Sequence, residues 1–165
     1  MPVERKLSTR ATARSWQRWL QLIVGLAIFG IAVALMIRSE LGLGPWDAFH
    51  VGLNRLTGIT VGSASIAAGV VIVVATLFIG VRPGPGTIAN MILIGVFIDI
   101  FLPLTPPASS TWLAFVYFGL GVIGCGFATG LYIAAGLGKG PRDGLMIGVS
   151  HRTGWRVGRV RTGIE

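Results

Sequence analysis

The apolar residues of the chain fall into long, mostly uncharged runs that are separated by short polar segments. Four runs are long enough to cross a hydrocarbon core of about 30 Å as helices with a rise of about 1.5 Å per residue. These runs cover residues 19–37, 62–80, 87–104 and 111–137. The pattern therefore predicts four membrane-spanning helices. Gly126, Gly130 and Ala134 recur every four residues in the last run, which predicts a face suited to close helix packing.

Two further segments, residues 45–57 and 141–153, have the pattern of helices that are too short to cross. Each follows a Gly-x-Gly-Pro sequence and carries an aspartate two residues after the proline, which is typical of a helix start. As a helix, residues 46–57 would extend about 18 Å. We therefore expect two re-entrant or interfacial helices.

The two short segments belong to an internal repeat with an offset of 96 residues. Residues 41–62 and 137–158 share ten of 22 positions without a gap. The identical positions include Pro45/Pro141, Asp47/Asp143 and, upstream, Trp16/Trp112. We therefore divide the chain into a tail (1–18), a first repeat (19–110) and a partial second repeat (111–165) with an incomplete span from residue 158. The repeat length leads us to expect a truncated chain, since about 35 further residues would complete the second copy.

The net charge of +8 is distributed unevenly along the sequence. If the basic tail lies in the cytoplasm and the short helices return to the side they left, twelve basic residues lie inside and only Arg38 and Arg55 outside. This agrees with the excess of Lys and Arg in cytoplasmic loops. The first copy then has an odd number of spans, so the second copy is inverted. The sequence thus predicts an all-α integral membrane protein with an inverted repeat, a plan that recurs in secondary transporters.

Composition excludes several classes of protein. Hydrophobic residues make up 53% of the chain and charged residues 12%, with a mean hydropathy of +0.76, which is not the composition of a soluble domain. The single cysteine, Cys125, excludes an internal disulfide and a multi-cysteine metal site. Since no catalytic constellation, phosphate loop or metal-ligand cluster is found, we expect no enzyme and no cofactor. Nucleic-acid binding is not expected either, because the basic residues are dispersed without interleaved aromatics.

Three motifs resemble a known family. Gly-Leu-Gly-Pro-Trp-Asp (42–47), Gly-Lys-Gly-Pro-Arg-Asp (138–143) and Arg-Val-Arg-Thr-Gly-Ile-Glu (159–165) resemble the YitT/YczE-like family of bacterial multi-pass membrane proteins. The resemblance covers nearly the whole chain beyond the tail. It implies a place in the bacterial cytoplasmic (inner) membrane and brings no established activity. Family members usually continue past the last motif, from which the end at Glu165 departs.

The candidate site is centred on the two Gly-Pro turns. It comprises Gly44, Pro45, Asp47, Gly140, Pro141, Arg142 and Asp143. In one interpretation each aspartate caps the N-terminus of its short helix, a contribution of about 0.5–2 kcal/mol. In the other, the two helix ends meet near a pseudo-two-fold axis and hold an ion or small anion. The two interpretations are compatible.

Other polar residues extend the candidate site. Asp47, His50 and Asn54 share one helical face, either as an interfacial surface or as part of a solute pathway. The second copy replaces His50 with Met146, so the architecture does not require the histidine. Arg161 and Glu165 are spaced for an i, i+4 ion pair.

Asp99 is a secondary candidate. It lies within an apolar run, where carboxylates are usually functional, although it is also close enough to the end of the run to reach the outer interface.

Two functional classes follow from these features. The inverted copies and broken helices favour a transporter-like protein that moves a small solute or ion, and the scarcity of polar residues in the spans favours a non-transporting accessory or scaffold protein. The candidate partners are anionic lipid headgroups at Arg152, Arg156 and Arg159, and a second copy of the chain in a homo-oligomer.

Overall fold

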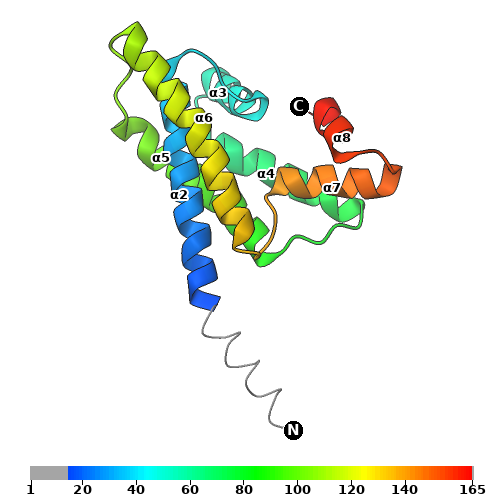
Figure 1. Cartoon of the computed structure of the whole chain (residues 1–165). Helices are drawn as coiled ribbons and strands as arrows, with labels where there is room; N and C mark the ends of the chain where they lie inside the picture. Colours follow the sequence, from blue (N-terminus) through cyan, green and yellow to red (C-terminus); the bar gives the residue numbers. More distant parts are fainter. Residues whose placement is uncertain (1–14, 165) are drawn as a thin grey trace, which may run out of the picture.

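The computed structural model describes residues 15–164, and all of the regular elements in that range are α-helices (Figure 1). They are α2 (Ser15–Ser39), α3 (Pro45–Thr57), α4 (Val61–Phe78), α5 (Pro85–Leu104), α6 (Thr111–Ala134), α7 (Pro141–Thr153) and α8 (Val157–Ile164). Four of them, α2, α4, α5 and α6, are long and apolar enough to cross a membrane. The predicted all-α class with four candidate spans is confirmed.

Two predicted boundaries need correction. The tail expected over residues 1–18 overlaps α2, which begins at Ser15; residues 1–14 lie outside the described part of the chain. Arg18 belongs to this helix, and its Nε and Nη2 atoms donate to Ala135 O (2.7 Å) and Gly136 O (2.5 Å) at the end of α6. The span expected to reach residue 137 ends at Ala134, since Gly136 turns the chain with φ 64°.

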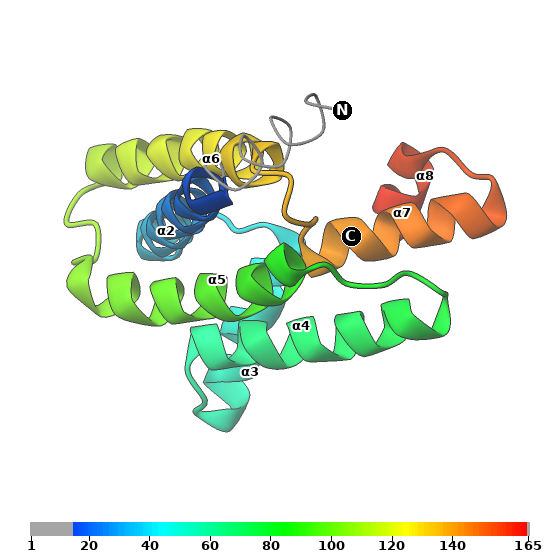
Figure 2. The same ribbon diagram turned by 90° about the horizontal axis from the view of Figure 1, so that it is seen from below.

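The long helices lie side by side in the order α6, α2, α5, α4 (Figure 2). The short helix α7 packs against α4 and α5, and α3 packs against α4. Two bonds join α5 to the segment before α7: Gly86 N donates to Leu137 O (2.9 Å) and Thr87 Oγ1 to Lys139 O (2.6 Å). These contacts hold the segment before α7 against the start of α5.

Glycines allow α2 and α6 to pack closely in antiparallel directions. A Cβ built on Gly25 would lie 3.0 Å from Tyr132 N and 3.3 Å from Ala128 O. A Cβ built on Gly121 would lie 2.9 Å from Ala32 O. At both ends of the contact, therefore, the backbone of one helix occupies the space that a side chain on the other would need.

The small-residue face predicted at Gly126, Gly130 and Ala134 does not form this contact. All three residues are exposed, and a Cβ on either glycine would have no atom within 4 Å beyond its own surroundings. The packed face of α6 is instead the one that carries Gly121 and Ala128. The two packed residues are seven positions apart, so the spacing of four in this glycine-rich helix did not identify the packed face.

The two short helices end in the same turn. Gly58 and Gly154 have φ 76° and 70°, in the left-handed region that glycine adopts readily, and each donates to the carbonyl four residues before it. Polar side chains bond across both turns: Asn54 Nδ2 donates to Ile59 O (2.6 Å) and Ser150 Oγ to Trp155 O (2.6 Å). Since Asn54 and Ser150 are equivalent positions of the repeat, the repeated sequence produces a repeated local structure.

Gly30 and Gly126 are equivalent in the repeat but differ in packing, which gives a matched test of the helix contacts. A Cβ on Gly30 would lie 2.5 Å from Phe97 Cβ on α5, whereas one on Gly126 meets nothing within 4 Å. We expect Gly30→Ala to destabilise the protein by about 1–3 kcal/mol through overpacking. Gly126→Ala should be neutral or slightly stabilising, because alanine is the better helix former.

The measurement is thermal unfolding of both variants in the same detergent, followed by size exclusion. Equal melting temperatures for the two variants would contradict the close packing of α2 on α5 at Gly30.

Candidate functional site

Each short helix begins at a glycine and a proline that set its direction. Gly44 (φ −61°, ψ 153°) and Gly140 (φ −55°, ψ 155°) have extended backbones, and the proline after each is the first helical residue. Neither glycine offers a side chain to cap the helix. The first-turn aspartates turn back towards these glycines: a Cβ on Gly44 would lie 3.3 Å from Asp47 Oδ2, and one on Gly140 3.1 Å from Asp143 Oδ2.

Both helix starts line a single cavity of about 580 Å³. Residues from all seven described helices contribute to its wall. The charged and hydrogen-bonding side chains of the wall are Trp46, Asp47, Ser65, Asn90, Thr129, Tyr132, Arg142, Asp143 and Arg161. The rest of the lining is largely apolar. This combination of an apolar wall and a few convergent polar groups is typical of a small-molecule site.

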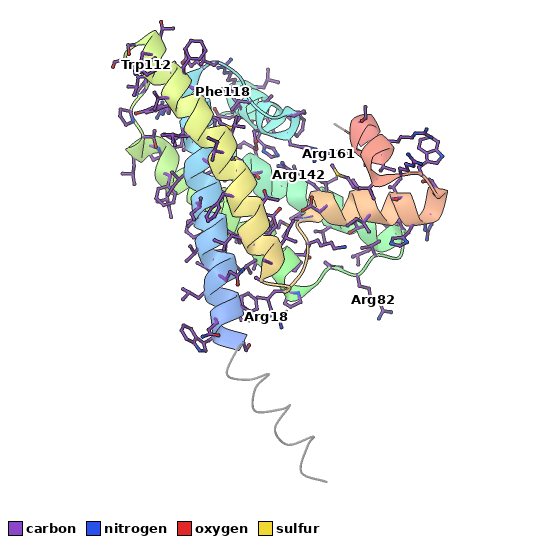
Figure 3. All side chains as sticks on the ribbon, in the orientation of Figure 1. Arg18, Arg82, Trp112, Phe118, Arg142 and Arg161 are labelled. Carbon is purple, nitrogen blue, oxygen red and sulfur yellow. The ribbon has the colours of Figure 1, made fainter. Side chains whose placement is uncertain are left out.

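Arg142 connects the two short helices (Figure 3). Its guanidinium carbon lies 5.1 Å from the centre of the Trp46 ring, a cation–π arrangement. Its Nη2 atom is 3.5 Å from His50 Nε2. His50 is fully buried, and its Nδ1 atom is 3.9 Å from Asp47 Oδ1. Residues from the two copies of the repeat therefore form one cluster of charged and aromatic side chains.

Burial determines the protonation of this cluster. Burial, together with the positive charge of Arg142, lowers the pKa of His50 to about 4. Burial raises the pKa of the Asp47 carboxyl above its ordinary value, and the attraction of Arg142 partly offsets this. At neutral pH His50 is therefore uncharged, which suits its position beside a guanidinium.

A second polar group surrounds the start of α7. Tyr132 OH donates to Asp143 Oδ2 (3.2 Å). Asn90, on α5, is 4% exposed and lies against Gly140, where a Cβ would be 3.3 Å from its Oδ1 atom. Within residues 15–164, the Asn90 Nδ2 and Trp46 Nε1 atoms are buried without a hydrogen-bond partner. Both residues belong to the cavity wall through other atoms, because these two nitrogens are themselves buried.

The structure brings most of the predicted site residues together. Eight of them line the cavity: Gly44, Pro45, Asp47, Gly140, Pro141, Arg142, Asp143 and Arg161. His50 lies behind the lining, in contact with Arg142. Asn54 is not at the cavity, because its amide closes the turn at the end of α3. Glu165, the expected partner of Arg161, lies outside the described residues.

Asp99 is placed away from the cavity. Its Oδ1 atom accepts from Gly62 N (2.8 Å), and its Oδ2 atom accepts from Thr60 Oγ1 (2.5 Å). This carboxylate on α5 therefore caps the N-terminus of α4, where backbone N–H groups lack partners within the helix.

Sequence reasoning missed three polar groups of the cavity. Trp46, Asn90 and Tyr132 line the cavity but were not among the candidate site residues. An amide inside an apolar run is itself a signal, because polar groups are costly in lipid without a role. In the described part of the chain, no three His, Cys, Asp or Glu side chains gather as a metal site would require.

Residues 16–165 match the model of a family of unknown function, DUF6198. The uncharacterized membrane protein YczE of Bacillus subtilis is 45% identical over 150 residues, which cover 90% of this chain and 70% of YczE. An uncharacterized protein of Haemophilus influenzae is 31% identical over 144 residues (87% of this chain, 66% of that protein). The uncharacterized protein YyaS of Bacillus subtilis is 30% identical over 130 residues (75% and 64%). No solved structure matches the chain.

The lowered pKa of His50 predicts a pH-dependent stability. Between about pH 6.5 and pH 4 the unfolded chain binds a proton at this histidine that the folded protein does not, so folding weakens as the pH falls. The variant His50→Met introduces the residue found at the equivalent position, Met146. It cannot bind this proton, so it should not lose stability for this reason as the pH falls. The wild type should therefore lose up to about 3 kcal/mol relative to the variant over this range.

Melting temperatures of both proteins at pH 7 and pH 4.5 measure the difference. Asp47 and Arg142, the ionisable groups that face His50, are present in both proteins. Parallel pH profiles would contradict a buried, neutral histidine.

Proposed function

The chain belongs to the DUF6198 family, whose function is unknown, so we propose a role from the cavity of this chain. We propose a transporter-like protein of the bacterial cytoplasmic membrane that binds a small solute or ion between its two short helices. The family confirms the YczE-like resemblance of the Gly-x-Gly-Pro-x-Asp motifs, and the chain is a membrane protein by its relative and its apolar helices. The binding and transport of a solute are our proposal and do not follow from the family.

The observation that carries the proposal is the position of the charged groups. Asp47, Arg142 and Asp143 line a cavity whose wall also includes residues of the four apolar candidate spans, α2, α4, α5 and α6. Charged side chains at such places are costly and usually serve a solute or ion pathway. The starts of α3 and α7 also line the cavity, and the starts of broken helices form the binding sites of secondary transporters.

Contacts between equivalent residues support an inverted repeat. Gly25 contacts the backbone of Tyr132, and its equivalent Gly121 contacts the backbone of Met36, the equivalent of Tyr132. Such an exchange of partners is expected for two copies related by a two-fold axis.

The pair at the centre of the cavity supports the same relation. Trp46 and Arg142 are also equivalent positions, and they stack on each other. Equivalent residues that touch each other lie near the axis that relates the two copies. A binding site on this axis is what inverted-repeat transporters have in common.

The distribution of basic residues supports the orientation. With the N-terminus in the cytoplasm, the exposed Arg152, Arg156 and Arg159 lie on the cytoplasmic side, where anionic headgroups would bind them. We propose these arginines as the lipid-binding surface of the protein.

Reporter fusions test the inverted topology. A fusion after Ser110 should be external, and a fusion after Gly138 should be cytoplasmic, because α6 lies between the two positions and crosses once. Alkaline phosphatase and a fluorescent protein that matures only in the cytoplasm give opposite signals at each site. A cytoplasmic Ser110 or an external Gly138 would contradict the arrangement.

Flux into proteoliposomes tests transport. We expect saturable uptake of at least one of acetate, phosphate, glutamate, glucose and sodium, and we expect Asp47→Ala to abolish it because the variant removes a charge from the cavity wall. Glu40→Ala is the matched control, since this exposed acid does not line the cavity. If none of the panel is taken up, the alternative of a non-transporting accessory or scaffold protein is favoured.

A further inference from the structure

A second cavity, of about 610 Å³, lies at the end of the molecule where α2 and α5 end and α4 begins. Val51, Val61 and Leu102 line it from α3, α4 and α5, and Arg38 and Arg55 supply positive charges to its wall. The proposed topology places this end of the helices on the external side of the membrane. Charged side chains at such places face water-filled space, so a solute can enter the second cavity from the external side.

One partition separates the second cavity from the first, which is the cavity that both short-helix starts line. The helix α3 forms part of this partition: Trp46 and Asp47, at its start, line the first cavity, whereas Ala48 and Val51 line the second. Met36, on α2, forms another part, because within residues 15–164 it is the residue that the two linings have in common. A solute that moves between the cavities therefore has to displace either the helix α3 or Met36.

Met36 has a mobile type of side chain on a backbone that is held in place. Ser39 Oγ donates to Met36 O (2.7 Å), and the Nε and Nη2 atoms of Arg38 donate to Leu102 O on α5 (3.2 Å and 2.9 Å). The methionine side chain is unbranched and adapts to irregular spaces. The two cavities beside it leave room for a change of rotamer that a close-packed core would resist. The side chain can therefore move without a movement of α2.

The equivalent residue of the second copy is fixed by a hydrogen bond. Tyr132 occupies the position of Met36 in the repeat and also lines the first cavity, but its OH donates to Asp143 Oδ2 (3.2 Å) at the start of α7. In an inverted repeat, equivalent residues lie on opposite sides of the central site. The first cavity thus has a bonded tyrosine on one side and a methionine, which offers no such donor, on the other. The side at Met36 is the one that opens more easily.

We propose that Met36 is a gate between the two cavities: rotation of its side chain opens a path by which a small solute passes from the external cavity to the central one. This inference rests on the proposed transport function and adds its entry route and its gating residue. While Met36 moves, the bond between Tyr132 and Asp143 keeps the opposite side closed, so the central cavity opens to one side of the membrane at a time.

Cys125 allows the gate to be tested by chemical labelling. It is the only cysteine of the chain, and it lines the first cavity but not the second. The membrane-impermeant thiol reagent p-chloromercuribenzenesulfonate is added to spheroplasts, which expose the external face, and to inside-out vesicles, which expose the cytoplasmic face. The mass of the purified protein then gives the fraction labelled at each time, and Cys125→Ser supplies the unlabelled blank.

Two variants of Met36 change the gate in opposite directions. Met36→Ala removes most of the side chain and should speed the labelling of Cys125 from the external face at least ten-fold, because the rate follows the fraction of open molecules. Met36→Leu keeps a similar volume with a branched, less flexible side chain and should slow it. Met91→Ala is the matched control, since this methionine lines only the first cavity, and it should change the rate less than about two-fold. Melting temperatures identify any variant that fails to fold.

The outcomes separate the gate from transport. A rate that is the same in Met36→Ala and the wild type, or an equal increase in Met91→Ala, would overturn the gate, whatever the flux assay shows. An increase in Met36→Ala from the cytoplasmic face alone would overturn the external route. External labelling that depends on Met36, in a protein that takes up no solute in proteoliposomes, would uphold the gate and contradict transport.

Discussion

The close contact between α2 and α6 joins the two copies of the repeat, and the rest of the helix arrangement is built around it. Gly25 and Gly121 each leave room for the backbone of the opposite helix, so the two helices meet at both ends of their contact. Apolar helices gain little from the hydrophobic effect within lipid, and close backbone approach supplies much of their attraction. Because the two helices are antiparallel, α2 and α6 end at opposite ends of this contact, and the segments that follow them return both Gly-Pro turns to one cavity.

Within the cavity, the charged groups compensate one another. The guanidinium of Arg142 stacks on Trp46, lies beside the neutral His50 and attracts Asp47. Burying a single charge without a partner would cost several kcal/mol of desolvation free energy. The two copies of the repeat contribute different residues to this cluster, so a backbone with repeated turns carries an asymmetric set of side chains. That asymmetry allows tryptophan and arginine to meet where two arginines would repel each other.

The candidate site could be predicted wherever its signal was local. A glycine, a proline and an aspartate in fixed order mark a helix start, and the structure places Asp47 and Asp143 in the first turns of α3 and α7. Asn54 was misplaced because helical periodicity gives the face of a residue but not its partner. At the end of a helix the nearest unsatisfied carbonyl is the partner, and Asn54 bonds the one at Ile59.

The sequence by itself determined the all-α class, the four candidate spans, the two short helices and their repeated turns, because each depends on spacing along one segment. Only the tertiary structure decided which face of α6 packs, that Asp99 caps α4, and that Asn90 and Trp46 join the wall of the cavity. Glycine spacing fits several faces of one helix. Contacts between helices depend on how distant segments are placed in space, and the order of residues within one segment does not contain that information.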